Sequence, residues 1–159
     1  MTELDDLGLR LPIQGVQLIE ASAGTGKTFT MATLYARLVI ETGLPVSAIL
    51  AVTFTEAATK ELRGRLRARL VLAQRLLTAA LADMPFDLGQ DKPTQDEETR
   101  LTRILLRAAV AREGAGALCR RLRLACEQMD LAPIHTIHGF CRRALADHAL
   151  EAGQSLLER

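Results

Sequence analysis

The residues best suited to chemistry form one short run near the amino terminus, the sequence "ASAGTGKT" at residues 21–28. It ends like a phosphate-binding loop, in which backbone N–H groups point at phosphate oxygens and the following helix adds the positive end of its dipole. In such a loop Lys27 would reach the β- and γ-phosphates, and the Thr28 hydroxyl would ligate Mg²⁺. The run therefore predicts a site for a nucleoside triphosphate with magnesium.

The first position of the run departs from the general GxxxxGK[ST] pattern, because it holds alanine rather than glycine. Alanine is the next smallest residue, so the turn can form if φ there stays negative. We expect every residue of the run to line the nucleotide site, with Lys27 and Thr28 as the catalytic candidates: Ala21, Ser22, Ala23, Gly24, Thr25, Gly26, Lys27 and Thr28. A chance glycine-rich turn is the alternative, but the apolar run before it and the helical pattern after it favour the loop.

A second group of candidates lies in "AVTFTEAATKELRGRL" at residues 51–66. If a buried strand ends here, Phe54 and Thr55 emerge at the carboxyl edge of a sheet, where parallel sheets bind ligands. An aromatic ring and hydroxyl groups at that edge suit a stacked base and a phosphate backbone. The alternative is that Phe54 belongs to the core and Thr55 is a helix N-cap. Both interpretations stay open at this point.

The helix expected after this edge has a basic flank. It carries Lys60, Arg63, Arg65, Arg67, Arg69 and Arg75. Such a flank can neutralise nucleic-acid phosphates, and Arg63 is the candidate DNA contact. It can equally be an ordinary solvated helix face.

A third group lies in "IHTIHGFCRRAL" at residues 134–145. The spacing of His135 and His138 suggests a metal site, but no glutamate lies between them and no third ligand is near, so zinc is excluded. Thr136, His138 and Phe140 instead offer a hydroxyl, an imidazole and a ring, a mixture that suits a single DNA strand. The alternative is that Thr136 or His138 only caps the following helix.

The elements that would position these groups follow from hydrophobic periodicity. A buried strand at 16–20, a helix at 27–41 stopped by Gly43 and Pro45, and a second strand at 48–54 predict a βαβ unit with parallel strands. Beyond it we expect, in order, a long helix at 55–81, a polar surface loop at 83–98, helices from 97 to about 129 with a break near Gly114 and Gly116, an extended link at 132–138, and a last helix from near Gly139.

The composition is that of a soluble globular protein. Of 159 residues, 48% are apolar and 25% charged, and the net charge of +1 points to no particular partner. The three cysteines form no CxxC pair, the amino terminus is acidic without an apolar signal core, and no apolar run could span a bilayer. We therefore expect a cytoplasmic protein without a membrane segment.

Together the three groups resemble motifs I, Ia and Ib of superfamily 1 DNA helicases of the UvrD/RecB type, and are most similar to the exodeoxyribonuclease V beta-subunit branch. The resemblance covers nearly the whole chain and is weakest from about residue 71 to 129. It implies an α/β fold, the P-loop (RecA-like) parallel sheet with flanking helices, here incomplete and with a helical insertion. It implies ATP and Mg²⁺ as cofactors, and it places Phe54, Thr55, Thr136 and His138 near single-stranded DNA.

The resemblance also implies a larger function. Members are ATP-dependent DNA helicases with exonuclease activity that act on duplex ends in double-strand break repair and recombination, and they work with partner subunits called gamma and alpha. By this comparison residues 1–70 form the first part of the core with motifs I and Ia, residues 71–131 a helical insertion, and residues 132–159 the return to the core with motif Ib.

One departure limits that expectation. The family's motif II needs an acidic pair after an apolar strand. The pair Asp96-Glu97 lies in a polar loop after Pro93, so we reject it as motif II. We therefore expect an amino-terminal fragment with little ATPase activity alone. The alternatives are a stand-alone P-loop nucleotide-binding or regulatory module and, less consistent with residues 52–65, a small-molecule kinase.

Overall fold

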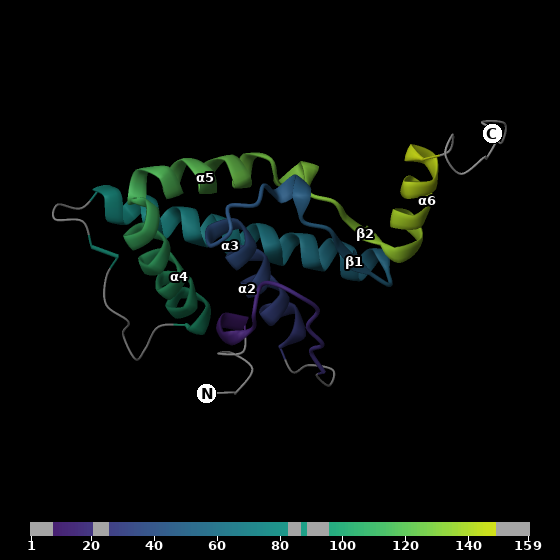
Figure 1. The fold of residues 1–159 in the computed structure, drawn as a ribbon, viewed down its shortest axis with the longest axis horizontal. Coiled ribbons are helices and arrows are strands. Elements are labelled where there is room, and N and C mark those ends of the chain that lie inside the picture. Colours follow the sequence, from purple (N-terminus) through teal and green to yellow (C-terminus); the bar gives the residue numbers. More distant parts are fainter. Residues whose placement is uncertain (1–7, 21–25, 83–86, 89–95, 149–159) are drawn as a thin grey trace.

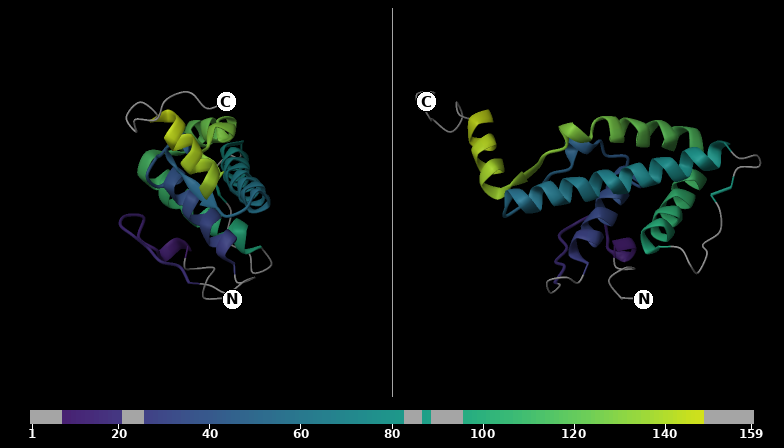
Figure 2. Two further views of the ribbon diagram at one scale, coloured as in Figure 1. Left: turned by 90° about the vertical axis from the view of Figure 1, so that its right-hand side faces the viewer. Right: turned by 180° about the vertical axis from the view of Figure 1, so that it is seen from behind.

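The computed structural model describes residues 8–20, 26–82, 87–88 and 96–148, and helices make up most of it (Figure 1). Helix α3 forms the long axis of the molecule, and α5 lies along it (Figures 1 and 2). Helices α2 and α4 pack against these two, and α6 stands near the start of α3. The helices are α2 (Lys27–Ile40), α3 (Glu56–Ala82), α4 (Glu97–Glu113), α5 (Ala115–Glu127) and α6 (Ile137–Asp147), with short 3-10 turns η1 (Val46–Ala48) and η2 (Met129–Leu131).

The sheet within the described residues consists of two parallel strands, β1 (Ala51–Thr53) and β2 (Ile134–Thr136). In their register Ala51 lies opposite Ile134 and Thr53 opposite Thr136. Residues 134–136, expected to be an extended link, are therefore a strand. The crossover that joins the two parallel strands contains α3, α4 and α5.

The prediction of a buried strand at residues 16–20 is wrong. These residues form no strand, and Val16 and Leu18 are 98% and 82% exposed. An extended segment is stabilised by the neighbours that complete its hydrogen-bond ladder. Strand β1 pairs with β2, and no segment of the described chain pairs with residues 16–20. The predicted βαβ unit between 16–20 and 48–54 is therefore not observed.

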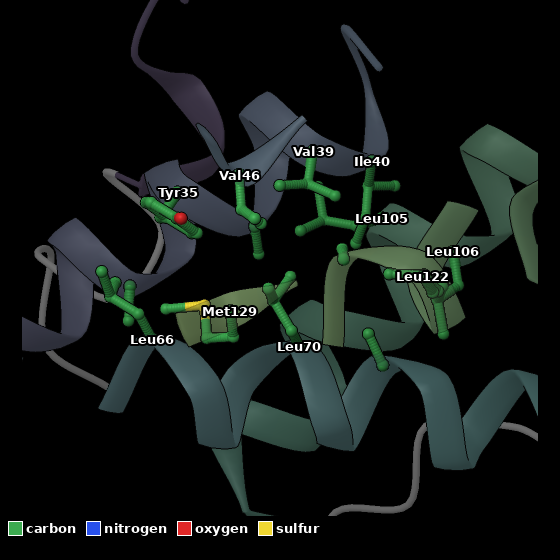
Figure 3. Packing of buried hydrophobic residues seen from close by; sticks show 14 of the residues in the cluster. Tyr35, Val39, Ile40, Val46, Leu66, Leu70, Leu105, Leu106, Leu122 and Met129 are labelled. Carbon is green, nitrogen blue, oxygen red and sulfur yellow. The ribbon is translucent and has the colours of Figure 1, made fainter. Parts of the chain in front are cut away.

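The core is built by helices, and most of its side chains are Leu, Ala, Val and Ile. Helix α3 buries leucines at helical spacing, Leu62, Leu66, Leu70 and Leu77. They meet buried side chains of α2, α4, α5 and η2, among them Val39, Ile40, Leu105, Leu106, Leu122 and Met129 (Figure 3). Full burial of one such leucine contributes roughly 1.5–3 kcal/mol, so this cluster is the main source of stability.

Helix boundaries agree closely with the sequence. Helix α2 ends at Ile40 before Gly43, which has φ +74°, and α4 and α5 are separated by Gly114, which has φ +85°. Both glycines adopt the left-handed conformation that side chains disfavour. Most of the predicted loop at 83–98 lies outside the described residues, but Leu88 within it is buried against the core rather than solvated.

The segment before the phosphate loop is attached to α2 by one arginine. The guanidinium of Arg37 donates to the carbonyl oxygens of Gly8 and Leu11, each at 2.7 Å, and pairs with Glu41 at 2.8 Å. Gly8 lies so close to Thr33 that an added Cβ would stand 2.9 Å from the Thr33 methyl group. Residues 8–11 are thus packed onto α2, whereas residues 16–18 are exposed.

The described helices include none that is both long and apolar enough to cross a bilayer. The cysteines are free thiols, with Cys119 and Cys126 half-buried and Cys141 exposed. Burial raises the pKa of the Cys126 thiol, and the positive charge of Arg67 partly opposes this.

Candidate functional site

The end of the predicted phosphate loop lies at the start of α2. Gly26 has φ 89° and ψ 11° and leads directly into the helix, whose first residues are Lys27 and Thr28. No side chain of the described residues caps this end. The first backbone N–H groups of a helix point out of its amino-terminal end, and the helix dipole favours an anion there. Ala21, Ser22, Ala23, Gly24 and Thr25 lie outside the described residues, so their predicted roles stay predictions.

A hollow of about 390 Å³ opens at this end of α2. It is lined by Gly26, Lys27, Thr28 and Phe29 from α2 and by Glu61 and Arg65 from α3. The Arg65 guanidinium lies 3.0 Å from the Glu61 carboxylate, and both side chains are exposed. A lysine, a hydroxyl and the amino-terminal end of a helix around one hollow are the groups that bind a triphosphate with Mg²⁺ in phosphate-binding loops.

Phe54 and Thr55 follow β1 directly. The Phe54 side chain is 85% exposed, so the interpretation of Phe54 as a core residue is wrong. Thr55 is the cap of α3, because its hydroxyl accepts from the Ala58 N–H at 3.1 Å. The Thr53 and Thr59 hydroxyls hydrogen-bond at 2.5 Å and fix the turn between strand and helix. The turn therefore holds the phenyl ring out in solvent.

The basic residues of α3 differ in their surroundings: some are paired with distant segments, some are exposed, and one is buried. Arg63 donates to the Ile134 carbonyl oxygen at 2.9 Å, and Arg67 pairs with Asp130 at 2.5 Å, so both reach the segment that leads into β2. Lys60 and Arg65 are exposed, whereas Arg69 is fully buried. The basic flank is thus not one continuous surface, and Arg63 is held at the sheet.

The junction of β2 and α6 brings the third group of candidates to the same edge. Thr136 is the N-cap of α6, accepting from the Gly139 N–H at 3.1 Å, and its hydroxyl also donates to Glu56 at 3.3 Å. Thr136 therefore caps α6, and its predicted place near DNA stays a prediction. His138 is exposed in the first turn of α6. The described residues contain no cluster of three or more His, Cys, Asp or Glu side chains that could hold a metal.

A second hollow, of about 580 Å³, joins these elements. Its polar lining comes from the first turns of α3, from β2 and from α6: Glu56, Thr59, Arg63, His135, Thr136, Arg142 and Arg143. The sequence did not single out Glu56 as a site residue. The feature of the sequence that could have identified Glu56 is its position directly after the cap Thr55, in the first turn of α3.

The hollow at Lys27 and the turn that carries Phe54 both adjoin the amino-terminal half of α3. Because β1 and β2 are parallel, their carboxyl ends share one edge, where α3 and α6 begin. The hollow at Lys27 reaches Glu61 and Arg65, which lie in the second and third turns of α3. The amino-terminal end of α2 and the exposed turn after β1 thus both lie along the first turns of α3.

The pKa values of two further side chains, Tyr35 and Asp96, are shifted. Burial raises the pKa of Tyr35 to about 12, and the charge of Arg63 opposes this rise. Hydrogen bonds from the Thr99 backbone and hydroxyl lower the pKa of Asp96, which is the N-cap of α4. Glu97 pairs with Arg100. The pair Asp96-Glu97 therefore starts a helix, which agrees with its rejection as motif II.

Comparison with known proteins agrees with this arrangement. Residues 8–158 match the model of the UvrD/REP helicase N-terminal domain. The chain is 45% identical to the RecBCD enzyme subunit RecB of Escherichia coli over 162 residues and 42% identical to that of Haemophilus influenzae over 152 residues. It is 33% identical to RecB of Chlamydia trachomatis over 151 residues.

These alignments cover 94% and 91% of this chain for the Escherichia and Haemophilus proteins, but 12% of the length of each of those proteins. For the Chlamydia protein the shares are 93% and 13%. The family match spans the three sequence motifs and all the helices and strands from α2 to α6. The chain therefore belongs to the UvrD/REP helicase N-terminal domain family.

Proposed function

We propose that the chain is the ATP-binding part of a DNA helicase subunit of the RecB kind. The observation that carries this proposal is the hollow at the start of α2, where Lys27, Thr28 and the αL Gly26 come together. Membership of a helicase family supports ATP as the nucleotide. The fold would be the first part of a P-loop (RecA-like) sheet, with residues 71–131 as a helical insertion whose proposed boundary falls inside α3.

The residues present fit ATP with Mg²⁺. The N–H groups at the start of α2 and the Lys27 ammonium group would hold the phosphates, and the Thr28 hydroxyl would ligate the metal. Bound Mg²⁺ would neutralise charge on the β- and γ-phosphate oxygens. Glu61 and Arg65 stand at the rim of the same hollow as a charge pair.

Single-stranded DNA would lie along the edge formed by the ends of β1 and β2. Phe54 offers an exposed ring for base stacking, and Arg63, Arg142 and Arg143 give the neighbouring hollow a positive lining. Thr55 and Thr136 would contribute as helix caps that fix this edge, with exposed His138 beside it. Exonuclease activity, double-strand break repair, recombination and the gamma and alpha partner subunits are proposed for a protein of the relatives' full length.

The test of the ATP site is calorimetry with Mg-ATP. We expect binding by the wild-type chain and at least about a tenfold loss of affinity in Lys27→Ala. Lys60→Ala is the matched control, because Lys60 is an exposed lysine of α3 outside the hollow. Unchanged affinity in Lys27→Ala, or no heat from the folded wild-type chain, would refute the proposal.

We also propose that the isolated chain hydrolyses ATP slowly. Asp96 and Glu97 serve the start of α4, and Glu61, the described carboxylate that lines the hollow, is paired with Arg65. Steady-state hydrolysis with single-stranded DNA tests this. Robust turnover that Lys27→Ala abolishes would contradict it. The alternative, a stand-alone nucleotide-binding module, predicts ATP binding without salt-sensitive affinity for single-stranded DNA.

A further inference from the structure

Arg69 is a buried charge beside the nucleotide hollow. Its side chain is 1% exposed, yet it lies on the basic flank of α3 that the sequence presents as a helix surface. Moving a charged group out of water is costly even when it is paired, and an apolar side chain of similar size is often at least as stabilising. A guanidinium at this position therefore needs a reason beyond filling space.

The contacts of Arg69 join two segments that are distant in sequence. Its guanidinium lies over the Phe29 ring, 4.7 Å from the ring centre. On the side of α4, its Nε atom lies 3.0 Å from the Glu98 carboxylate. Its Nη1 atom donates to the Glu98 carbonyl oxygen at 3.3 Å and to the Thr102 hydroxyl at 3.4 Å. One side chain thus connects the first turn of α2 with the first turn of α4.

Phe29 makes this connection relevant to the nucleotide. It directly follows Lys27 and Thr28, and it lines the same hollow. A cation over an aromatic ring is attracted by the negative face of the ring, and more strongly when the cation is buried as Arg69 is. Holding the ring fixes the rotation of the first turn of α2, on which the directions of the Lys27 and Thr28 side chains depend.

The charge of Arg69 is balanced from α4. Burial lowers the pKa of the Arg69 guanidinium, and the negative charges of Glu98 and Asp96 oppose this. Glu98 lies in the first turn of α4, and Asp96 is the N-cap of that helix. The negative charges at the start of α4 thus oppose the cost of burying the Arg69 guanidinium against the Phe29 ring.

We propose that Arg69 is a positioning residue of the nucleotide site, which couples α4 to the phosphate-binding end of α2 through Phe29. The proposal rests on the proposed ATP site. It implies that displacement of α4 loosens the start of α2 and weakens nucleotide binding. Arg69 itself is not among the residues that line the hollow.

A matched arginine at the other end of α2 provides the control. Arg121 donates to the Ile40 carbonyl oxygen at 3.2 Å and pairs with Glu113. Arg69→Met and Arg121→Met each remove one guanidinium from the surroundings of α2, and thermal denaturation checks that both variants are folded. If Arg69 positions the site, Arg69→Met weakens Mg-ATP binding about tenfold in the folded state, whereas Arg121→Met changes it less than about twofold.

Three further variants sharpen the test. Arg69→Lys keeps the charge without the planar group, so we expect an intermediate affinity. Phe29→Leu should weaken binding as Arg69→Met does, and the double variant should be no worse than either, because the two groups act as one unit. Wild-type affinity in folded Arg69→Met, or equal losses in Arg69→Met and Arg121→Met, would overturn the proposal.

A second measurement needs no nucleotide. The Thr30 N–H donates to the Gly26 carbonyl oxygen at 2.9 Å and reports on the first turn of α2. Its hydrogen exchange should accelerate in Arg69→Met and not in Arg121→Met. If the wild-type chain binds no ATP, the proposed function fails, and this exchange still decides whether Arg69 holds the turn.

If Arg69→Met does not fold, Glu98→Gln decides instead. Glu98 is partly exposed and Gln has its shape, so the variant should fold. We expect about a threefold loss of ATP affinity, with Glu97→Gln as the control because Glu97 pairs with Arg100. Equal affinities in these two variants would reject the coupling through α4.

Discussion

The helical half of the molecule, α2 to α5, is closed around a buried core, whereas its sheet end, where α6 follows β2, is open to solvent. Helices α2 to α5 bury a continuous cluster, in which Leu70, Leu77 and Leu122 are fully covered. Helix α6 buries no residue, and its apolar side chains Phe140 and Leu145 are substantially exposed. A helix satisfies its backbone hydrogen bonds internally, whereas a strand depends on neighbours. Stability is thus concentrated in the helices, and groups available for recognition lie at the sheet end.

The strongest test of this contrast is a pair of leucine truncations. Leu70→Ala should lower the free energy of unfolding by about 3 kcal/mol, because it leaves a cavity in the closed core. Leu145→Ala on α6 should change it by less than about 0.5 kcal/mol. Urea denaturation at pH 7 measures both. Comparable losses would mean that α6 is as well packed as α3 and would break the comparison.

The two helix caps at the shared edge give a smaller effect. Thr55→Ala removes the cap of α3, which belongs to the closed half, and should lower the free energy of unfolding by about 1 kcal/mol. Thr136→Ala removes the cap of α6, so we expect faster hydrogen exchange confined to α6 with little change in global stability. Hydrogen exchange by mass spectrometry separates the two outcomes. If Thr136→Ala lowered the global stability and Thr55→Ala did not, α6 rather than α3 would belong to the closed half.

Glu113 tests the closed half through pH. The hydrogen bond from Arg121 lowers the pKa of Glu113, with a further contribution from Arg112, and both arginines donate to the Ile40 carbonyl oxygen. Since the folded pKa lies below the unfolded value of about 4.3, this stabilisation is present above that value and is lost as pH falls through the folded pKa.

We therefore expect Glu113→Gln to cost up to about 1 kcal/mol at pH 7, because the carboxylate is only partly covered, and to remove part of the acid-induced loss of stability. Urea titrations at pH 7 and in acid compare the variant with wild type. Glu127→Gln is the control, because its pair with Arg123 is exposed and 3.9 Å long. The same acid slope in wild type and Glu113→Gln would contradict the prediction.

Local signals in the sequence were sufficient for the helices. The periodicity from Lys27 to Ile40, the break at Gly114 and the cap at Thr55 depend on residues within a few positions of one another. Spacing alone also singled out Gly26, Lys27 and Thr28, which line one hollow in the fold. For Phe54 the sequence left two interpretations, and only the fold shows the ring in solvent.

Pairings between distant segments were not predictable. The apolar run at 16–20 looks like a buried strand, but nothing local specifies its neighbours, and β1 pairs instead with residues 134–136. The burial of Arg69 could not be predicted for a similar reason. Its partners Phe29 and Glu98 lie far away in the sequence, so a buried arginine reads like a solvated one. Only the tertiary structure shows which segment pairs with β1 and that Arg69 is buried.

Phe54 gives the smallest expected effect on stability and the sharpest test of the open end. Because its ring is in solvent, Phe54→Ala should change the free energy of unfolding by less than about 0.5 kcal/mol. If the ring stacks on a base, affinity for single-stranded DNA should fall about tenfold or more at fixed salt. Fluorescence anisotropy with a labelled oligonucleotide measures this, with the exposed Leu124→Ala on α5 as the control. A large loss of stability would place Phe54 in the closed half, and unchanged DNA affinity would remove the ring from the proposed DNA edge.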